Sequence, residues 1–163
     1  MVKGVLTLIL ALVLFASGYQ NENMEVRLLQ ETAQNVLQNP AAEELDGYME
    51  AVNAQSDAIR ASLEQDVLTQ MEMNEKSQEL YVLWDAAMNH LLEAAERSLP
   101  ETEYAALAEE QQVWLLQAEQ AVQEAGKEFE GGSIHALIVN SEAADLAQAR
   151  ACELYEMLQG ISL

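Results

Sequence analysis

The two histidines of this 163-residue chain, His90 and His135, are the first residues to consider for metal chemistry. Helical metal proteins often place a glutamate three residues before a histidine, which puts both ligands on one face of the helix. Here Ala87 and Gly132 occupy those two positions. Glu93 follows His90 in the reverse order and stands alone. We therefore expect no metal site and no cofactor, and we expect His90 to be a partly exposed helix residue.

The sequence also contains few residues that could serve in nucleophilic catalysis. Cys152 is the only cysteine, so no internal disulfide can form, and Arg150 is the only basic residue close to it. A reactive thiol needs a base beside it or a lowered pKa, so we expect a buried, inert thiol. Adjacent acids such as Glu109 and Glu110 are expected from composition alone in a chain with 28 acidic residues. The sequence also lacks a glycine-rich phosphate loop, and we predict that the protein is not an enzyme.

Charge is the strongest compositional signal. Acidic residues outnumber basic ones by 28 to 7, which gives a formal net charge of -21 at pH 7. A field of this sign repels nucleic acid and anionic membrane surfaces, and it speeds the encounter with basic partners. Solubility alone is the alternative explanation for so acidic a surface. We expect a basic protein as partner, if the charge serves binding, and no nucleic acid.

The first 20 residues, MVKGVLTLILALVLFASGYQ, have the layout of a secretory signal peptide. Lys3 supplies the charged start, an apolar run follows from Val5 to Phe15, and small residues precede Gly18. The run is shorter than the roughly 20 residues that cross a bilayer, so we expect cleavage after Gly18, with an uncut anchor as the alternative. A lipid anchor would need cysteine where Tyr19 stands. The expected location is extracytoplasmic: periplasmic, cell-surface or secreted.

Three breaks divide the remaining sequence, at Asn39-Pro40, Leu99-Pro100 and Gly131-Gly132. Between the breaks, apolar residues recur at steps of three and four, which is typical of amphipathic helices. Short connections between long helices favour antiparallel neighbours. We predict an all-α fold, an antiparallel helical bundle of four to five helices after the signal peptide. The expected helices span about 23–38, 41–66, 69–99, 100–130 and 134–158.

Two capping boxes support these boundaries. Thr69 with Glu72, and Ser98 with Glu101, have the spacing in which the first side chain accepts a backbone hydrogen bond and the glutamate reaches back. The second box would place Pro100 at the first helical position. Ser133 is a suitable N-cap for the last helix.

Both tryptophans lie on apolar stripes, so we predict that Trp84 and Trp114 pack in the core. On the fourth helix, Trp114 belongs to a seam with steps of three and four residues. That seam contains Tyr104, Leu107, Gln111, Trp114, Ala118, Ala121, Ala125 and Phe129.

Three segments resemble the lysozyme inhibitor LprI-like family, an all-helical extracytoplasmic domain. They are TQMEMNEKSQELYVLWDAAMNHLL, LAEEQQVWLLQAEQAV and GGSIHALIVNSEAADLAQARACEL, and together they cover about residues 66 to 158. The matching positions are Thr69, Met73, Asn74, Tyr81, Asp85, Asn89, Leu107, Gln111, Trp114, Gly131, Gly132, Ser133, Leu137, Ile138, Leu146, Arg150 and Leu154. The resemblance implies a signal peptide over 1–18, an N-terminal helical extension over 19–65 and an LprI-like domain over 66–160.

The sequence also departs from the family pattern. Relatives commonly carry an arginine and an acid where this chain has Ala118 and Glu119, and their cysteine positions read Lys76, Val122 and Glu142 here. The resemblance implies an exported binding protein that inhibits lysozyme by stoichiometric occlusion of its catalytic cleft. The alternative is an envelope-associated structural or protein-interaction module that does not bind lysozyme.

The positions expected to form a partner-binding or structural site come from the same three segments. Asp85 and Asn89 are four residues apart on one helix face, and we expect a polar network between them and Gln111 or Arg150. The turn at Gly132 and Ser133 is expected to join two helices, and an exposed turn is also where a binding surface would be placed. The full set is Asp85, Asn89, Gln111, Trp114, Gly132, Ser133 and Arg150.

Overall fold

The computed structural model describes residues 42–161, with side chains over 45–160. The predicted signal peptide over 1–18, Tyr19 and the expected helix over 23–38 lie outside these residues. Within residues 42–161, no helix is both long enough and apolar enough to cross a membrane.

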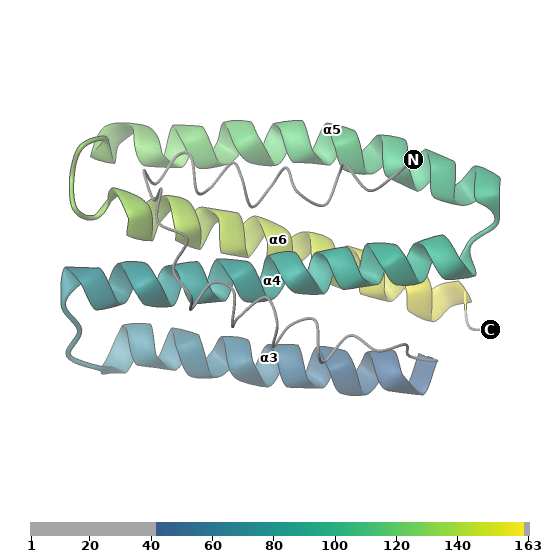
Figure 1. Ribbon diagram of the computed structural model, residues 1–163, viewed down its shortest axis with the longest axis horizontal. Coiled ribbons are helices and arrows are strands. Elements are labelled where there is room, and N and C mark those ends of the chain that lie inside the picture. The colour runs from purple at the N-terminus through teal and green to yellow at the C-terminus, as the bar shows by residue number, and fades with distance from the viewer. Residues whose placement is uncertain (1–41, 162–163) are drawn as a thin grey trace.

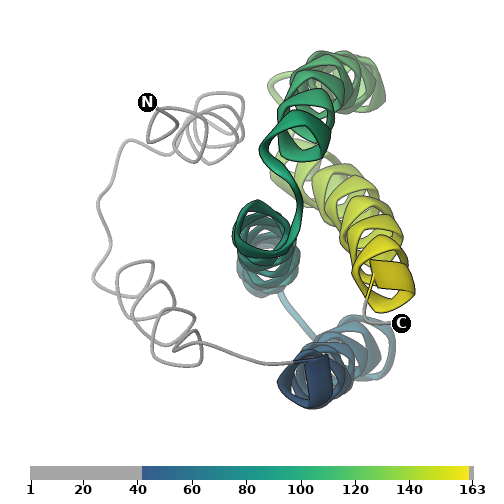
Figure 2. The same ribbon diagram turned by 90° about the vertical axis from the view of Figure 1, so that its right-hand side faces the viewer.

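Four long helices follow one another in antiparallel order (Figure 1). They are α3 (Ala42–Gln65), α4 (Gln70–Ser98), α5 (Glu101–Gly126) and α6 (His135–Ile161), with a 3₁₀ turn, η1 (Lys127–Phe129), after α5. Viewed along the helices, α4 and α6 occupy the middle, and α3 and α5 lie at opposite ends of the cross-section (Figure 2). The predicted all-α fold is therefore confirmed, and the expected helix boundaries agree to within a few residues.

The first predicted capping box is present at the start of α4. Thr69 Oγ1 accepts a hydrogen bond from the Glu72 backbone N–H at 3.3 Å, and a Glu72 carboxylate oxygen accepts from the Thr69 N–H at 2.7 Å. Hydrogen bonds from the Thr69 side chain and backbone lower the pKa of Glu72. These bonds satisfy two donors that the first turn of a helix cannot pair internally.

The second predicted capping box, Ser98 with Glu101, is wrong. Ser98 is the last residue of α4, and Pro100 is the N-cap of α5 without a side-chain cap. The Pro100 carbonyl accepts from the N–H groups of Glu103 and Tyr104, both at 3.0 Å. The reason is the very short connection: a residue before proline is held in extended backbone, so Leu99 ends α4 and leaves Ser98 inside it.

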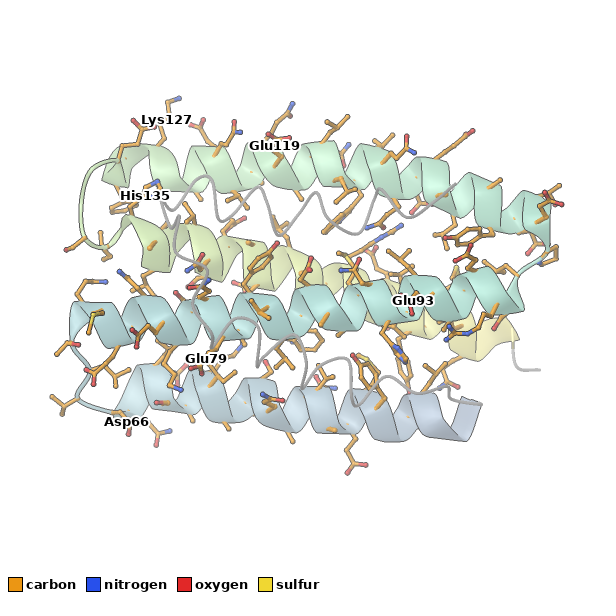
Figure 3. The ribbon with its side chains drawn as sticks, in the orientation of Figure 1. Asp66, Glu79, Glu93, Glu119, Lys127 and His135 are labelled. Carbon is orange, nitrogen blue, oxygen red and sulfur yellow. The ribbon has the colours of Figure 1, made fainter. Side chains whose placement is uncertain are left out.

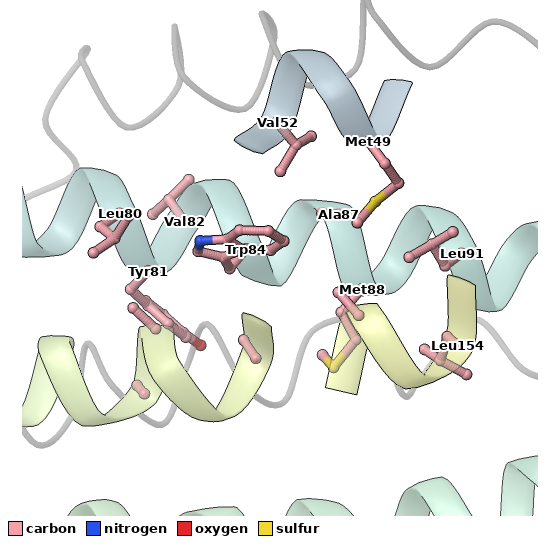
Figure 4. Close-up of a cluster of buried hydrophobic side chains, with 14 of the residues drawn as sticks. Met49, Val52, Leu80, Tyr81, Val82, Trp84, Ala87, Met88, Leu91 and Leu154 are labelled. Carbon is pink, nitrogen blue, oxygen red and sulfur yellow. The ribbon is translucent and has the colours of Figure 1, made fainter. Parts of the chain in front are cut away.

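The core runs along α4 and is closed by α3 on one side and α6 on the other (Figure 4). Trp84 is fully buried, as predicted, and its indole N–H donates to Ser56 Oγ of α3 at 3.0 Å. Small side chains line the facing stripe of α6 and let it approach α4 closely. These small residues are Ala143, Ala144, Ala147 and Ala151.

α3 belongs to the same core. Its buried stripe is Leu45, Met49, Val52 and Ile59. At its ends, α3 is also tied to α6 by polar contacts: Arg60 Nη2 donates to Asp145 and Gln148 at 2.7 and 2.8 Å, and the Tyr155 hydroxyl donates to Asp46 at 2.7 Å. The domain boundary near residue 66 remains a prediction.

α5 packs mainly against α6 and buries few side chains. The closest approach is at Gly126, where an added Cβ would lie 2.6 Å from Val139 Cγ1 and 2.8 Å from His135 Nε2. The backbone of α5 therefore reaches the start of α6 only because this residue has no side chain.

Candidate functional site

Arg150 of α6 is the centre of the polar cluster that fastens α5 to the bundle. Its side chain is 6% exposed, although its charge is paired with carboxylates that reach it from solvent. Arg150 Nε donates to Gln111 Oε1 at 2.8 Å, and Nη1 donates to Glu110 and Glu153 at 2.8 and 2.9 Å. We had expected Gln111 or Arg150 to bond with Asp85 and Asn89, but the two residues bond to each other instead. Charge-assisted bonds of this kind fix the register of two helices.

Asp85 and Asn89 of α4 form the second predicted pair. Asn89 Nδ2 donates to Asp85 Oδ2 at 3.1 Å, while Asp85 Oδ1 is buried without a hydrogen-bond partner. Burial raises the pKa of Asp85 to about 7, and the Asn89 bond opposes that shift. Burial and the unpaired oxygen favour the protonated, neutral form of this carboxyl more than water would.

We had expected one polar network, but the structure shows two separate hydrogen-bonded pairs, Asp85 with Asn89 and Gln111 with Arg150. Among the described residues, no hydrogen bond joins Asp85 or Asn89 to Gln111 or Arg150. The link between α4 and α5 is instead a weak one, from Gln111 Nε2 to Met88 Sδ at 3.5 Å. Spacing along one helix placed Asp85 beside Asn89, but it did not predict that Gln111 would bond with Arg150 and Met88.

Trp114 lies beside this cluster on α5. It is half-buried and packs against the edge of the core. Trp114 is therefore less enclosed than the predicted seam position implied, because α5 touches the bundle along one narrow stripe. The buried residues of α5 are Leu107, Gln111, Val122 and Gly126.

His90 is not a partly exposed residue, as we had expected, but a buried one. Its ring is 2% exposed, lies 4.4 Å from the Tyr48 ring of α3, and has no hydrogen-bond partner for either nitrogen. Burial, assisted by the positive charge of Arg97, lowers the pKa of His90, which favours the neutral ring. The expectation failed because α4 is covered from two sides, so its buried face is wider than one amphipathic stripe.

The described side chains do not support nucleophilic or metal-dependent catalysis. Cys152 is half-buried, and burial together with Glu156 and Glu153 raises the pKa of its thiol. Residues 45–160 contain no group of three or more histidine, cysteine or acidic side chains that could hold a metal ion. The polar clusters described above join neighbouring helices or neighbouring turns of one helix.

The remaining two predicted site residues, Gly132 and Ser133, lie in the turn between η1 and α6. Gly131 has a φ of 75°, a left-handed conformation that favours glycine. The Ser133 carbonyl accepts from Asn74 Nδ2 of α4 at 3.1 Å. This turn is thereby fixed to the start of α4, at the end of the bundle where Lys127 and His135 lie (Figure 3).

Several apolar residues near the helix ends are exposed, and the prediction that one of them, Phe129, lies on the buried seam is wrong. Val67 and Met71 flank the cap of α4, and Phe129 and Ile134 flank the glycine turn. An apolar residue beside an N-cap usually packs back onto its helix, so local patterns do not predict that these side chains face solvent.

One of three comparisons with known proteins agrees with the resemblance of the three segments. A comparison with curated proteins and one with solved structures each found no match. The family model described as Lysozyme inhibitor LprI matches residues 60–154. This span runs from the end of α3 through most of α6 and includes all seven predicted site residues. Because the match covers more than half of the chain, the protein belongs to the Lysozyme inhibitor LprI family.

Proposed function

We propose that this protein is exported and inhibits a lysozyme by binding it stoichiometrically and occluding its catalytic cleft. The observation that carries the proposal is the family match over residues 60–154. The signal-like first 18 residues and the absence of reactive side-chain groups among residues 45–160 support a binding role outside the cytoplasm.

The charge distribution supports a basic partner. α5 carries six glutamates and no basic residue between its first and last positions. Most of these glutamates are exposed, and although Glu110 and Glu124 are in ion pairs with Arg150 and Lys127, the helix keeps a strongly negative field. Many lysozymes are strongly basic, and complementary charge raises the rate of encounter more than it raises affinity. Apolar contacts must then supply most of the affinity.

The departure at Ala118 bears on where the partner sits, whereas Glu119 keeps an acid at the second place. Both positions are half-buried on α5, and Ala118 offers no charge. A binding mode that uses an arginine and an acid at these two places is therefore not open to this chain. The proposal relies on other surfaces.

The second proposal is an envelope-associated interaction module. Val113 and Leu116 are 54% and 61% exposed on the outer face of α5. Two neighbouring apolar side chains on a solvent-facing helix favour packing against another protein. This surface would serve a structural partner as well as a lysozyme.

Titration of the purified mature protein into hen-type and bacterial-type lysozymes tests the first proposal. Binding and residual wall-lytic activity are followed at low and at physiological salt, with a basic protein that lacks lytic activity as the control. We expect saturable inhibition near one to one that persists at physiological salt. Absence of binding, or weak binding that disappears with salt for lysozyme and control alike, contradicts inhibition and favours the interaction module.

A further inference from the structure

α5 lies at one end of the cross-section of the bundle, so one of its sides faces away from the other described helices (Figure 2). Residues on that side recur at steps of three and four, which places them in one line along the helix. We call them the outer stripe, and all six are exposed: Ala106, Glu109, Val113, Leu116, Gln120 and Gln123. At a rise of about 1.5 Å per residue, the outer stripe is roughly 25 Å long.

The centre of the outer stripe is apolar and uncharged. Val113 and Leu116 are 54% and 61% exposed. No charged residue occurs from Gln111 to Ala118, although 21% of the whole chain is charged. The solvent side of a surface helix ordinarily carries polar and charged residues. Two apolar side chains that lie one turn apart on this side therefore favour contact with another molecule.

α5 is held against α6 on its opposite side, so the outer stripe is ordered without a partner. Arg150 Nε of α6 donates to Gln111 Oε1 at 2.8 Å, and the backbone of α5 closely approaches Val139 of α6 at Gly126. Neither contact uses a residue of the outer stripe. A surface that is ordered before binding loses less conformational entropy when a partner arrives.

Charge limits what can cover the outer stripe. α5 carries six glutamates and no basic residue. Among the described residues, only Glu110 and Glu124 of these six form ion pairs. A second copy of this chain would bring its own net charge of -21 and an equally acidic α5, so the charges disfavour self-association. A partner with lysine and arginine side chains around an apolar contact fits both the charge and the apolar centre.

We propose that this protein binds the lysozyme with the outer stripe of α5. Val113 and Leu116 contact apolar side chains of the enzyme, and the glutamates of α5 face its basic residues. This inference rests on the proposed function. The charges raise the rate of encounter and set the orientation, whereas the buried apolar pair supplies affinity. The outer stripe also lies wholly within the residues 60–154 that match the family.

The first test removes the apolar side chains of the outer stripe and keeps the helix. Val113→Gln with Leu116→Gln adds no charge to the mature protein, and glutamine has a high helix propensity. Val67→Gln with Met71→Gln removes two exposed apolar side chains elsewhere and is the matched control. We expect the inhibition constant to rise about tenfold or more for the α5 pair and to stay within about twofold for the control pair. Thermal unfolding of both should be close to that of the parent, because these side chains are exposed.

The second test determines which sign of charge the partner presents to the outer stripe. Gln120→Lys and Gln120→Glu differ in sign at one exposed position, four residues after Leu116. The lysine variant should inhibit about fivefold more weakly than the glutamate variant at low salt, because only the lysine is repelled by a basic surface. The same two substitutions at Gln55, an exposed position of α3, change the net charge equally. There the two variants should agree within about twofold, because a distant charge is screened.

The parent protein is measured first, so that the two proposals can fail separately. If the parent does not inhibit lysozyme, the proposed function and the outer-stripe proposal both fail. If the parent inhibits and the α5 pair keeps its affinity, inhibition stands and the outer-stripe proposal is wrong. Tighter inhibition by Gln120→Lys than by Gln120→Glu also overturns it. Sedimentation of the parent tests the other occupant: self-association that the α5 pair abolishes would overturn the proposal and assign the outer stripe to a second copy of this chain.

Discussion

The two outer helices, α3 and α5, are attached to the central pair in different ways. α3 presents four buried apolar residues and receives a hydrogen bond from the fully buried Trp84. α5 buries fewer apolar side chains, and its central contact is polar, from Gln111 to Arg150. Its own tryptophan, Trp114, is only half-buried. One outer helix is held by apolar area and the other by a polar anchor.

The outer helix that buries more apolar side chains is not the one that the family match covers in full. Most of α3 precedes the family match, which begins at residue 60, whereas α5 lies wholly inside it. The helix with the stronger apolar attachment is therefore the one that the family pattern describes least. A helix held by a few polar contacts leaves more of its surface free, and α5 accordingly carries exposed glutamates and the apolar pair Val113 and Leu116.

The largest expected effect compares the two tryptophans. Trp84→Ala should lower the free energy of unfolding by about 3 to 5 kcal/mol, since it empties the centre of the core and leaves Ser56 without its donor. Trp114→Ala should cost only about 1 to 2 kcal/mol, because part of the ring already faces water. Urea unfolding followed by circular dichroism measures both.

The conservative variants Trp84→Phe and Trp114→Phe serve as controls for ring size. Trp84→Phe should still be destabilising, because it removes the indole N–H that Ser56 accepts. Equal losses for the two alanine variants would show that α5 is packed as firmly as α3 and would remove the contrast between them.

The second-largest expected effect is a change of stability with pH, caused by Asp85 on the face of α4 that meets α5. Asp85 lies one turn before Met88, which accepts from Gln111 of α5. Burial raises the pKa of Asp85 from 3.8 to about 7, so the folded protein holds this proton more tightly than the unfolded chain does. The stabilisation is complete below pH 3.8 and is lost as the pH rises through 7.

As the pH rises from 5 to 8, ionisation of Asp85 should therefore reduce the free energy of unfolding by about 2 to 3 kcal/mol. Asp85→Asn keeps an oxygen that accepts from Asn89 and carries no titrating proton. The variant should lose most of this pH dependence and be more stable than the parent at pH 8. An unchanged slope in Asp85→Asn would assign the pH dependence to the other acidic residues.

Helix periodicity predicted most of the fold. The breaks at Leu99-Pro100 and Gly131-Gly132 and the cap at Thr69 located the described helices to within a few residues. The cap at Ser98 was wrong because a local pattern cannot show that the preceding helix has already used that residue. His90 was misjudged for a related reason: its burial depends on Tyr48 of α3, which is remote in sequence.

The predicted site was recovered in part. Helix spacing placed Asp85 beside Asn89, but the bond between Gln111 and Arg150 was not predicted. Spacing within one helix does not fix the rotation of its neighbour, so the separation of these pairs by Met88 was not foreseen.

The smallest expected effect tests the polar anchor of α5. Arg150→Met removes the donor to Gln111 Oε1 and should cost about 1 to 2 kcal/mol, chiefly because a buried acceptor loses its partner. Glu110 and Glu153 contribute little to that loss, since both are exposed and regain water. Arg150→Met combined with Gln111→Leu should recover most of the stability, because no buried polar group is then left unpaired. A double variant as unstable as the sum of its single changes would show that apolar packing of the arginine stem, and not its hydrogen bond, attaches α5 to α6.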